Sequence, residues 1–220
     1  MVSTRASSRA DERPLSSSGK PSSSSSSSSS NPTQGSWSHA PSRLTLLWLA
    51  ISIPLVVWDT VYVLGRPHTM AGGFLHWPLY VPYALYAEID YVYGWKAVHD
   101  NLGFTSAQGL LNAVEIAMYL AYLWMCYERG SWTLDGRRGG KAALVGLSAA
   151  VMTLSKTVLY WANEYYSGFA GIGHNAPMDL LFLWIIPNGA WLVGSGYMIF
   201  DFGGNILDGL AMASEHRKSA

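Results

Sequence analysis

Cysteine and charged residues are both scarce in this chain of 220 residues. The single cysteine, Cys126, excludes an internal disulfide and a zinc site built from cysteines. Only 13% of the residues are charged, compared with about 25% in ordinary soluble domains. The 14 lysines and arginines balance 14 acidic residues, so the charge gives no reason to expect a nucleic-acid partner. Hydrophobic residues make up 50% of the chain, which directs attention to the membrane.

Residues 1–42 almost lack large apolar side chains and contain an unbroken run of serines over 22–30. Such a segment cannot bury enough apolar surface to offset its loss of conformational entropy. We therefore predict a disordered, serine-rich tail over 1–42. The absence of an apolar core near its start argues against a cleaved signal peptide.

Four apolar stretches follow the tail, over residues 44–64, 110–127, 142–162 and 178–200. A helix needs about 20 apolar residues to cross a bilayer, and the second stretch reaches this length only if it begins a few residues earlier. The sequence therefore predicts an all-α membrane protein. Its four-helix transmembrane domain covers 43–205, and a cytosolic tail covers 206–220. A shorter apolar patch at 74–87 contains two prolines and is expected to lie along the membrane interface or to form a bent loop.

Basic residues cluster in three regions: before the first stretch, between the second and third, and after the last. Four crossings place these regions on one side of the membrane, and the excess of lysine and arginine predicts that this side is cytosolic. Both termini are therefore expected in the cytosol. The loop over 65–108 and the shorter one over 167–175 then share the opposite side.

Several polar residues fall inside the apolar stretches, where a charged side chain costs roughly 2.5–3.5 kcal/mol on insertion scales. They include Asp59, Glu115, Lys156, Asp179 and Asn188, and Asn163 and Glu164 follow directly after the third stretch. Lys156, Tyr160 and Glu164 recur at helical spacing, so they share one face of their helix. Tyr119 shares a stripe with Glu115 in the same way. These residues predict either a polar cavity inside the bundle or ion pairs that hold the helices together, for example between Lys156 and Glu115 or Asp59.

A resemblance to a known family covers roughly residues 45–205, and its most specific part is the last quarter of the chain. Residues 158–169 read VLYWANEYYSGF and resemble the pattern VLYF-x-x-E-x-x-x-GF of the emopamil-binding protein family. Gly173 and His174 match the GH pair that follows in that family. Residues 188–193 read NGAWLV and are similar to its NALWLV segment, and Trp95 with Lys96 resembles an upstream WK pair.

The resemblance implies a four-helix EXPERA domain in the membrane of the endoplasmic reticulum. Enzymes of this family shift a sterol double bond from the eight to the seven position by proton transfer, without a redox cofactor or metal. By this resemblance, Glu115 is expected to be the proton-shuttling carboxylate, Asn188 to orient it or the sterol, and Trp191 to face the cationic intermediate. Asp59 would be the second catalytic carboxylate. Tyr160, Glu164 and Tyr119 would complete the substrate-binding wall.

Departures from the family leave three functions open. The enzymes carry a His and a Glu one turn apart in the first span, whereas this chain has Asp59 and no histidine within any span. That span resembles the sigma-two receptor branch, which binds sterols and amphiphilic amines. We therefore expect a sterol isomerase-like enzyme, a non-catalytic sterol-binding protein, or an isomerase or cyclase of specialised terpenoid metabolism. The ligand would be a sterol or another polycyclic lipid, and the sequence leaves open whether the protein forms a homodimer.

Overall fold

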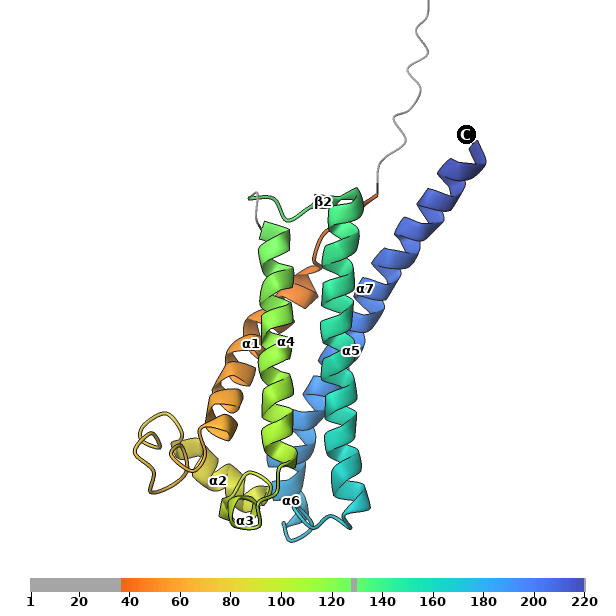
Figure 1. Ribbon diagram of the computed structural model, residues 1–220. Coiled ribbons are helices and arrows are strands. Elements are labelled where there is room, and N and C mark those ends of the chain that lie inside the picture. The colour runs from red at the N-terminus through yellow and green to blue at the C-terminus, as the bar shows by residue number, and fades with distance from the viewer. Residues whose placement is uncertain (1–36, 128–129, 220) are drawn as a thin grey trace, which may run out of the picture. The chain divides into compact units, whose positions relative to one another are not determined.

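The computed structural model describes residues 37–127 and 130–219 (Figure 1). Its long helices are α1 (Arg43–Leu64), α4 (Phe104–Tyr127), α5 (Gly136–Tyr166) and α7 (Ile186–Ser219). The short elements are β1 (Ser38–His39), α2 (Val81–Ile89), α3 (Trp95–His99), β2 (Leu134–Asp135), α6 (Pro177–Leu180) and the π-helical turn η1 (Leu181–Ile185). Four helices in the described residues are long and apolar enough to cross a membrane, and α6, η1 and α7 together form the last of them. The predicted all-α bundle with four transmembrane helices is confirmed.

The helices extend beyond the apolar stretches from which they were predicted. The second span begins at Phe104 instead of residue 110, because the polar side chains of Thr105 and Gln108 face the protein interior instead of lipid. The third begins at Gly136 and includes basic residues that were expected in the preceding loop. The predicted tail over 206–220 continues the last helix as far as Ser219.

The predicted disordered tail ends too late. Residues 1–36 lie outside the described residues, but β1 pairs with β2 in antiparallel register, Ser38 opposite Asp135. The Trp37 indole donates a hydrogen bond to the backbone oxygen of Asn205 over 3.0 Å. His39 is buried between the rings of α4 and α7. These two large side chains, at the end of an otherwise polar segment, supply the buried surface that orders residues 37–42.

Small residues bring the long helices together. α5 packs along both α4 and α7, and α1 packs along α4. A row of small buried residues follows α5: Gly139, Ala142, Ala143, Gly146, Ala149 and Ala150. A Cβ at Gly146 would lie only 2.6 Å from the Phe202 ring, so this aromatic side chain of α7 needs the glycine. Small residues allow such close approach between membrane helices.

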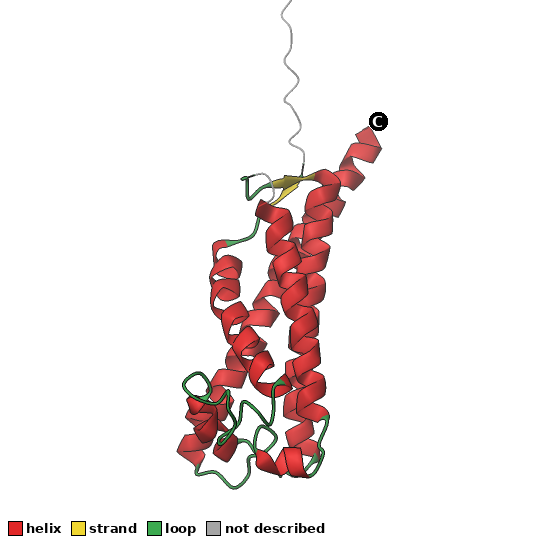
Figure 2. Cartoon of the chain, turned by 60° about the vertical axis from the view of Figure 1, so that its left-hand side comes forward, coloured by secondary structure: helices red, strands yellow, loops and turns green. Residues whose placement is uncertain are grey.

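The two ends of the bundle differ in construction. The strand end carries β1, β2 and the described C-terminal part of α7, whereas the loop end carries the segments 65–103 and 167–176 (Figures 1 and 2). At the loop end the Tyr91 amide donates to the Gly171 carbonyl over 3.1 Å, which joins the two segments. The apolar patch predicted at 74–87 consists of turns followed by α2. Its interfacial location remains a prediction.

Candidate functional site

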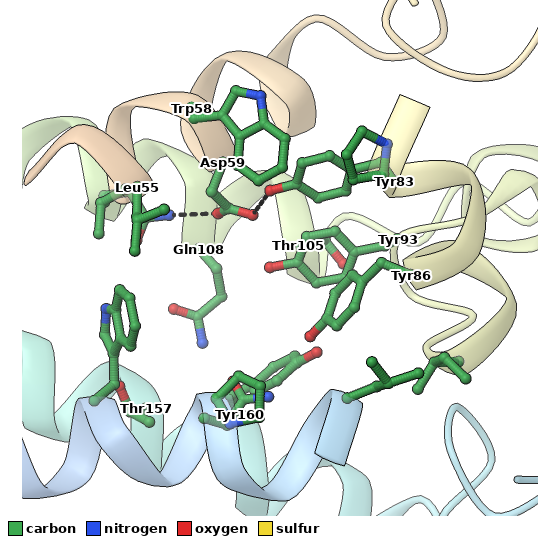
Figure 3. A pocket seen from close by; sticks show the side chains of 18 of the residues that line it. Leu55, Trp58, Asp59, Tyr83, Tyr86, Tyr93, Thr105, Gln108, Thr157 and Tyr160 are labelled. Atoms are coloured by element: carbon green, nitrogen blue, oxygen red, sulfur yellow. Dashed lines mark hydrogen bonds between the residues drawn. The ribbon is translucent and has the colours of Figure 1, made fainter. Parts of the chain in front are cut away.

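A cavity of about 470 Å³ lies among the helices near the loop end (Figure 3). Its volume falls within the range of roughly 300–1,000 Å³ that is typical of small-molecule sites. It is lined by Leu55, Val56, Trp58, Asp59, Pro82, Tyr83, Leu85, Tyr86, Ile89, Tyr93, Thr105, Gln108, Asn112, Lys156, Thr157, Tyr160, Leu183, Pro187, Asn188 and Trp191. Apolar and aromatic side chains dominate this wall.

The cavity exists because α1 and α7 are in contact at one point along their length and lie apart on the side of the loop end. They meet closely where the Trp48 indole covers Gly194, since a Cβ at that glycine would lie 2.3 Å from the ring. Beyond this contact the helices separate, and α2 covers the space between them. The Trp58 indole holds the segment before α2 through a hydrogen bond to the Leu79 carbonyl over 3.1 Å. Leu55 and Leu85 are exposed on the outer surface as well as lining the cavity, so the cavity opens toward the lipid side.

Asp59 is the one carboxylate among the residues that line the cavity. Its Oδ1 accepts a hydrogen bond from the Tyr83 hydroxyl over 2.7 Å, and its Oδ2 accepts one from Asn112 Nδ2 over 3.0 Å (Figure 3). The side chain is half-buried, because part of its surface faces the cavity. Three helices, α1, α2 and α4, thus fix the position of this carboxylate.

A buried polar chain continues from Asp59 into the bundle. Asn112 Oδ1 accepts a hydrogen bond from the Lys156 ammonium, and Lys156 Nζ lies 2.8 Å from Glu115 Oε2. Because a lysine can only donate, Asn112 must present its oxygen to Lys156 and its NH₂ group to Asp59. Two carboxylates and one ammonium give this chain a net charge of −1 when all three are ionised. A cationic group in the cavity would neutralise that charge.

The structure brings some of the predicted site residues together and separates others. Asp59, Tyr160, Asn188 and Trp191 all line the cavity, whereas Glu115 lies behind it and is bound to Lys156. The predicted alternative of an ion pair between Lys156 and Glu115 is therefore present.

Two predicted wall residues lie elsewhere. Tyr119 is buried toward the strand end, and its hydroxyl lies 3.0 Å from Thr153 Oγ1. Glu164 accepts a hydrogen bond from the Gly171 amide over 3.1 Å and so fixes the loop at 167–176. Helical spacing placed both on the buried face of their helix, but it could not tell which residues along the helix axis border the cavity.

A second polar group lies across the cavity from Asp59. Figure 3 shows the hydroxyl ends of Tyr86 and Tyr160 directed toward each other. Burial raises the pKa of the Tyr86 hydroxyl, so it keeps its proton at neutral pH. Behind Tyr160, the buried Asp90 accepts hydrogen bonds from the Tyr160 hydroxyl and from Trp184 Nε1, the latter over 2.8 Å. Burial also raises the pKa of Asp90, although these hydrogen bonds oppose the effect.

The sequence analysis missed several wall residues. Gln108 and Asn112 precede Glu115 at helical spacing and therefore share its face. Asn112 already lies within the predicted second stretch, whereas Gln108 would have required an earlier start for that span. Tyr83 and Asp90 reach the site only through the folding of the 65–103 segment, for which the sequence offers no comparable periodic signal. In the described part of the chain, no three His, Cys, Asp or Glu side chains gather as metal ligands would.

Comparisons with protein-family models, with curated proteins and with solved structures find no match for this chain.

Proposed function

We propose that the protein binds a sterol or another polycyclic lipid in this cavity and shifts a double bond in it by proton transfer. The observation that carries the proposal is an aromatic cavity inside a membrane bundle with a single carboxylate, Asp59, among its lining residues. A rigid lipid of several fused rings suits such a space, because apolar contacts supply most of its binding energy. The exposed rim formed by Leu55 and Leu85 gives the lipid a route from the bilayer.

The resemblance in sequence supports the same proposal. Tyr160, Asn188 and Trp191 belong to the segments that resemble the emopamil-binding protein family, and all three line one cavity. These three residues, chosen for their sequence pattern, therefore meet at a single place in the fold, whereas Glu164 of the same segments does not. The proposal includes the location implied by that resemblance, the membrane of the endoplasmic reticulum, with both termini in the cytosol.

The chemistry requires one proton to be added and another to be removed. Protonation of one alkene carbon leaves a carbocation on its neighbour, and loss of a proton from the next carbon forms the shifted double bond. Asp59 gives the proton when it is protonated and accepts one when it is ionised, so no net proton is consumed. The rings of Trp58 and Trp191 stabilise the intermediate positive charge by cation–π interaction, worth about 0.5–2 kcal/mol each.

A second candidate is a non-catalytic protein that binds sterols and amphiphilic amines. The observation that favours it is the position of Glu115, which is bound to Lys156 behind the cavity and leaves Asp59 as the acid that faces the ligand. When Asp59, Lys156 and Glu115 are all ionised, their net charge of −1 suits a ligand ammonium group. Such a contact is a charge-assisted hydrogen bond, which contributes about 1.5–3 kcal/mol.

The experiment is complementation of yeast that lacks sterol isomerase, with the sterols identified by mass spectrometry. Wild-type protein should restore the shifted double bond, and Asp59→Asn should not, because an amide cannot transfer the proton. The control is Tyr197→Phe, which removes a hydroxyl bonded to Ser42 away from the cavity and should retain activity.

Amine binding separates the two candidates. Asp59→Asn should weaken binding of an amphiphilic amine by about tenfold or more under either candidate. Tight amine binding by wild-type protein that converts no sterol would leave the binding function alone. Failure to bind either amines or sterols would reject both candidates.

A further inference from the structure

The orientation of the Tyr160 hydroxyl is fixed by the buried carboxylate of Asp90. Asp90 is completely buried, and its carboxylate accepts three hydrogen bonds, from the Tyr160 hydroxyl, from Trp184 Nε1 and from the Val92 amide. Trp184 reaches it from the π-helical turn η1, a kind of wide turn that is frequent at functional sites. Because the Tyr160 proton points to Asp90, the phenol oxygen can only accept hydrogen bonds on the side that faces the cavity.

Asn188 is oriented in a similar way. Its Nδ2 donates a hydrogen bond to the Trp184 carbonyl over 2.9 Å, which fixes the amide and leaves Oδ1 as an acceptor. Its second N–H remains a donor. The cavity therefore has two oriented acceptors at this end, the Tyr160 oxygen and Asn188 Oδ1.

Tyr86 can satisfy only one of these acceptors at a time. Its hydroxyl carries a single proton, and its hydroxyl end is directed toward that of Tyr160, in the same cavity wall as Asn188 (Figure 3). One acceptor is therefore left for a donor on the ligand. A ligand hydroxyl fits this group, because it donates to the remaining acceptor and accepts from the second N–H of Asn188 or from Tyr86. A ketone offers no proton, and a hydrocarbon offers neither a proton nor an acceptor.

We propose that Tyr86, Tyr160 and Asn188 form a hydroxyl-binding site, positioned by Asp90, which selects polycyclic alcohols over the corresponding ketones and hydrocarbons. The inference rests on the proposed function and makes it more specific, since it names the polar group of the lipid and its place in the cavity. The alcohol is held across the cavity from Asp59, so Asp59 meets a different part of the fused rings (Figure 3).

The test measures binding of cholestanol, cholestanone and cholestane to purified full-length protein by displacement of a fluorescent sterol. Cholestanol should bind about threefold to tenfold more tightly than the other two, as expected for one hydrogen bond between neutral groups. Equal affinity of all three would overturn the hydroxyl-binding site and leave the proposed function intact. Failure of all three to bind would reject the proposed function, and this inference with it.

Variants test whether the preference for cholestanol over cholestane arises at the hydroxyl-binding site. Tyr160→Phe should bring the ratio of cholestanol to cholestane affinity close to one, since it removes the oriented acceptor and frees Asp90. Asp90→Asn keeps a similar shape and should reduce the ratio in part, while cholestane affinity stays unchanged, which separates positioning of Tyr160 from general unfolding. Tyr197→Phe, which removes a phenol hydroxyl outside the cavity, should keep the wild-type ratio. An unchanged ratio in folded Tyr160→Phe protein would overturn the assignment.

Discussion

Replacing Lys156 by methionine should destabilise the protein strongly, because it leaves Glu115 as an unpaired charge in the bundle. The two side chains are only 9% and 3% exposed, and their charged atoms lie 2.8 Å apart. Removing one partner of a buried ion pair costs roughly 3–5 kcal/mol. That is a large share of the total stability of about 5–15 kcal/mol that is usual for a folded protein.

The expected shift is measurable by thermal unfolding in detergent micelles. For a chain of this size, each kcal/mol changes Tm by about 2–4 °C, so Lys156→Met should lower Tm by roughly 6–20 °C. The double variant Glu115→Gln/Lys156→Met removes both charges and should recover most of the loss in Tm, because no unpaired charge then remains buried in the bundle. Lys141→Met, on the same helix at an exposed position, is the matched control and should leave Tm almost unchanged. A Tm for Lys156→Met close to that of the wild type, or no recovery in the double variant, would refute the buried ion pair.

Three further predictions address other parts of the fold. Burial lowers the pKa of His39 below its ordinary 6.5, so the folded protein binds fewer protons than the unfolded one. The free energy of unfolding should therefore fall as the pH drops below about 6.5, by up to about 1.4 kcal/mol per pH unit. Unfolding titrations at several pH values measure this slope. His39→Asn should lose this slope, and an identical slope in the variant would assign it to other groups. Gly194→Ala should lower the free energy of unfolding by about 1–3 kcal/mol, because the added Cβ would overlap Trp48. Gly196→Ala on the same helix is the control and should have little effect, because its Cβ would enter open space. Equal shifts of Tm in the two variants would contradict the close contact. For topology, a glycosylation acceptor placed in 167–176 should be modified and one placed in 130–135 should not, and the reverse result would invert the orientation.

The four spans were predictable from the sequence because the length of an apolar run is a property of consecutive residues. Each span is a run of apolar residues long enough to cross the hydrocarbon core, and the chain offers few other such runs. Helical spacing also identified the buried face of α5, on which Lys156, Tyr160 and Glu164 all lie. Periodicity specifies a face of a helix, and it could not specify the neighbour that each residue meets along that face.

The composition of the site depends on tertiary contacts that a periodic pattern does not encode. Glu115 and Asn112 lie one turn apart on α4 and both contact Lys156, yet only Asn112 also hydrogen-bonds with Asp59 at the cavity. A rise of about 1.5 Å per residue along the helix is enough to decide which of the two residues borders the cavity. Asp90 was missed because it lies in a connecting segment, and only the folding of that segment brings it to Tyr160.

Photo-crosslinking tests the central claim most directly, that the cavity holds a polycyclic lipid. Purified protein would be irradiated with a sterol that carries a diazirine on its ring system, and the labelled residues would be identified by tandem mass spectrometry. The account predicts labels on cavity residues such as Tyr83, Tyr86 and Trp191, and loss of these labels when excess unlabelled sterol competes. Labels confined to outward-facing residues such as Val193 and Leu120, or labels that unlabelled sterol does not reduce, would contradict it.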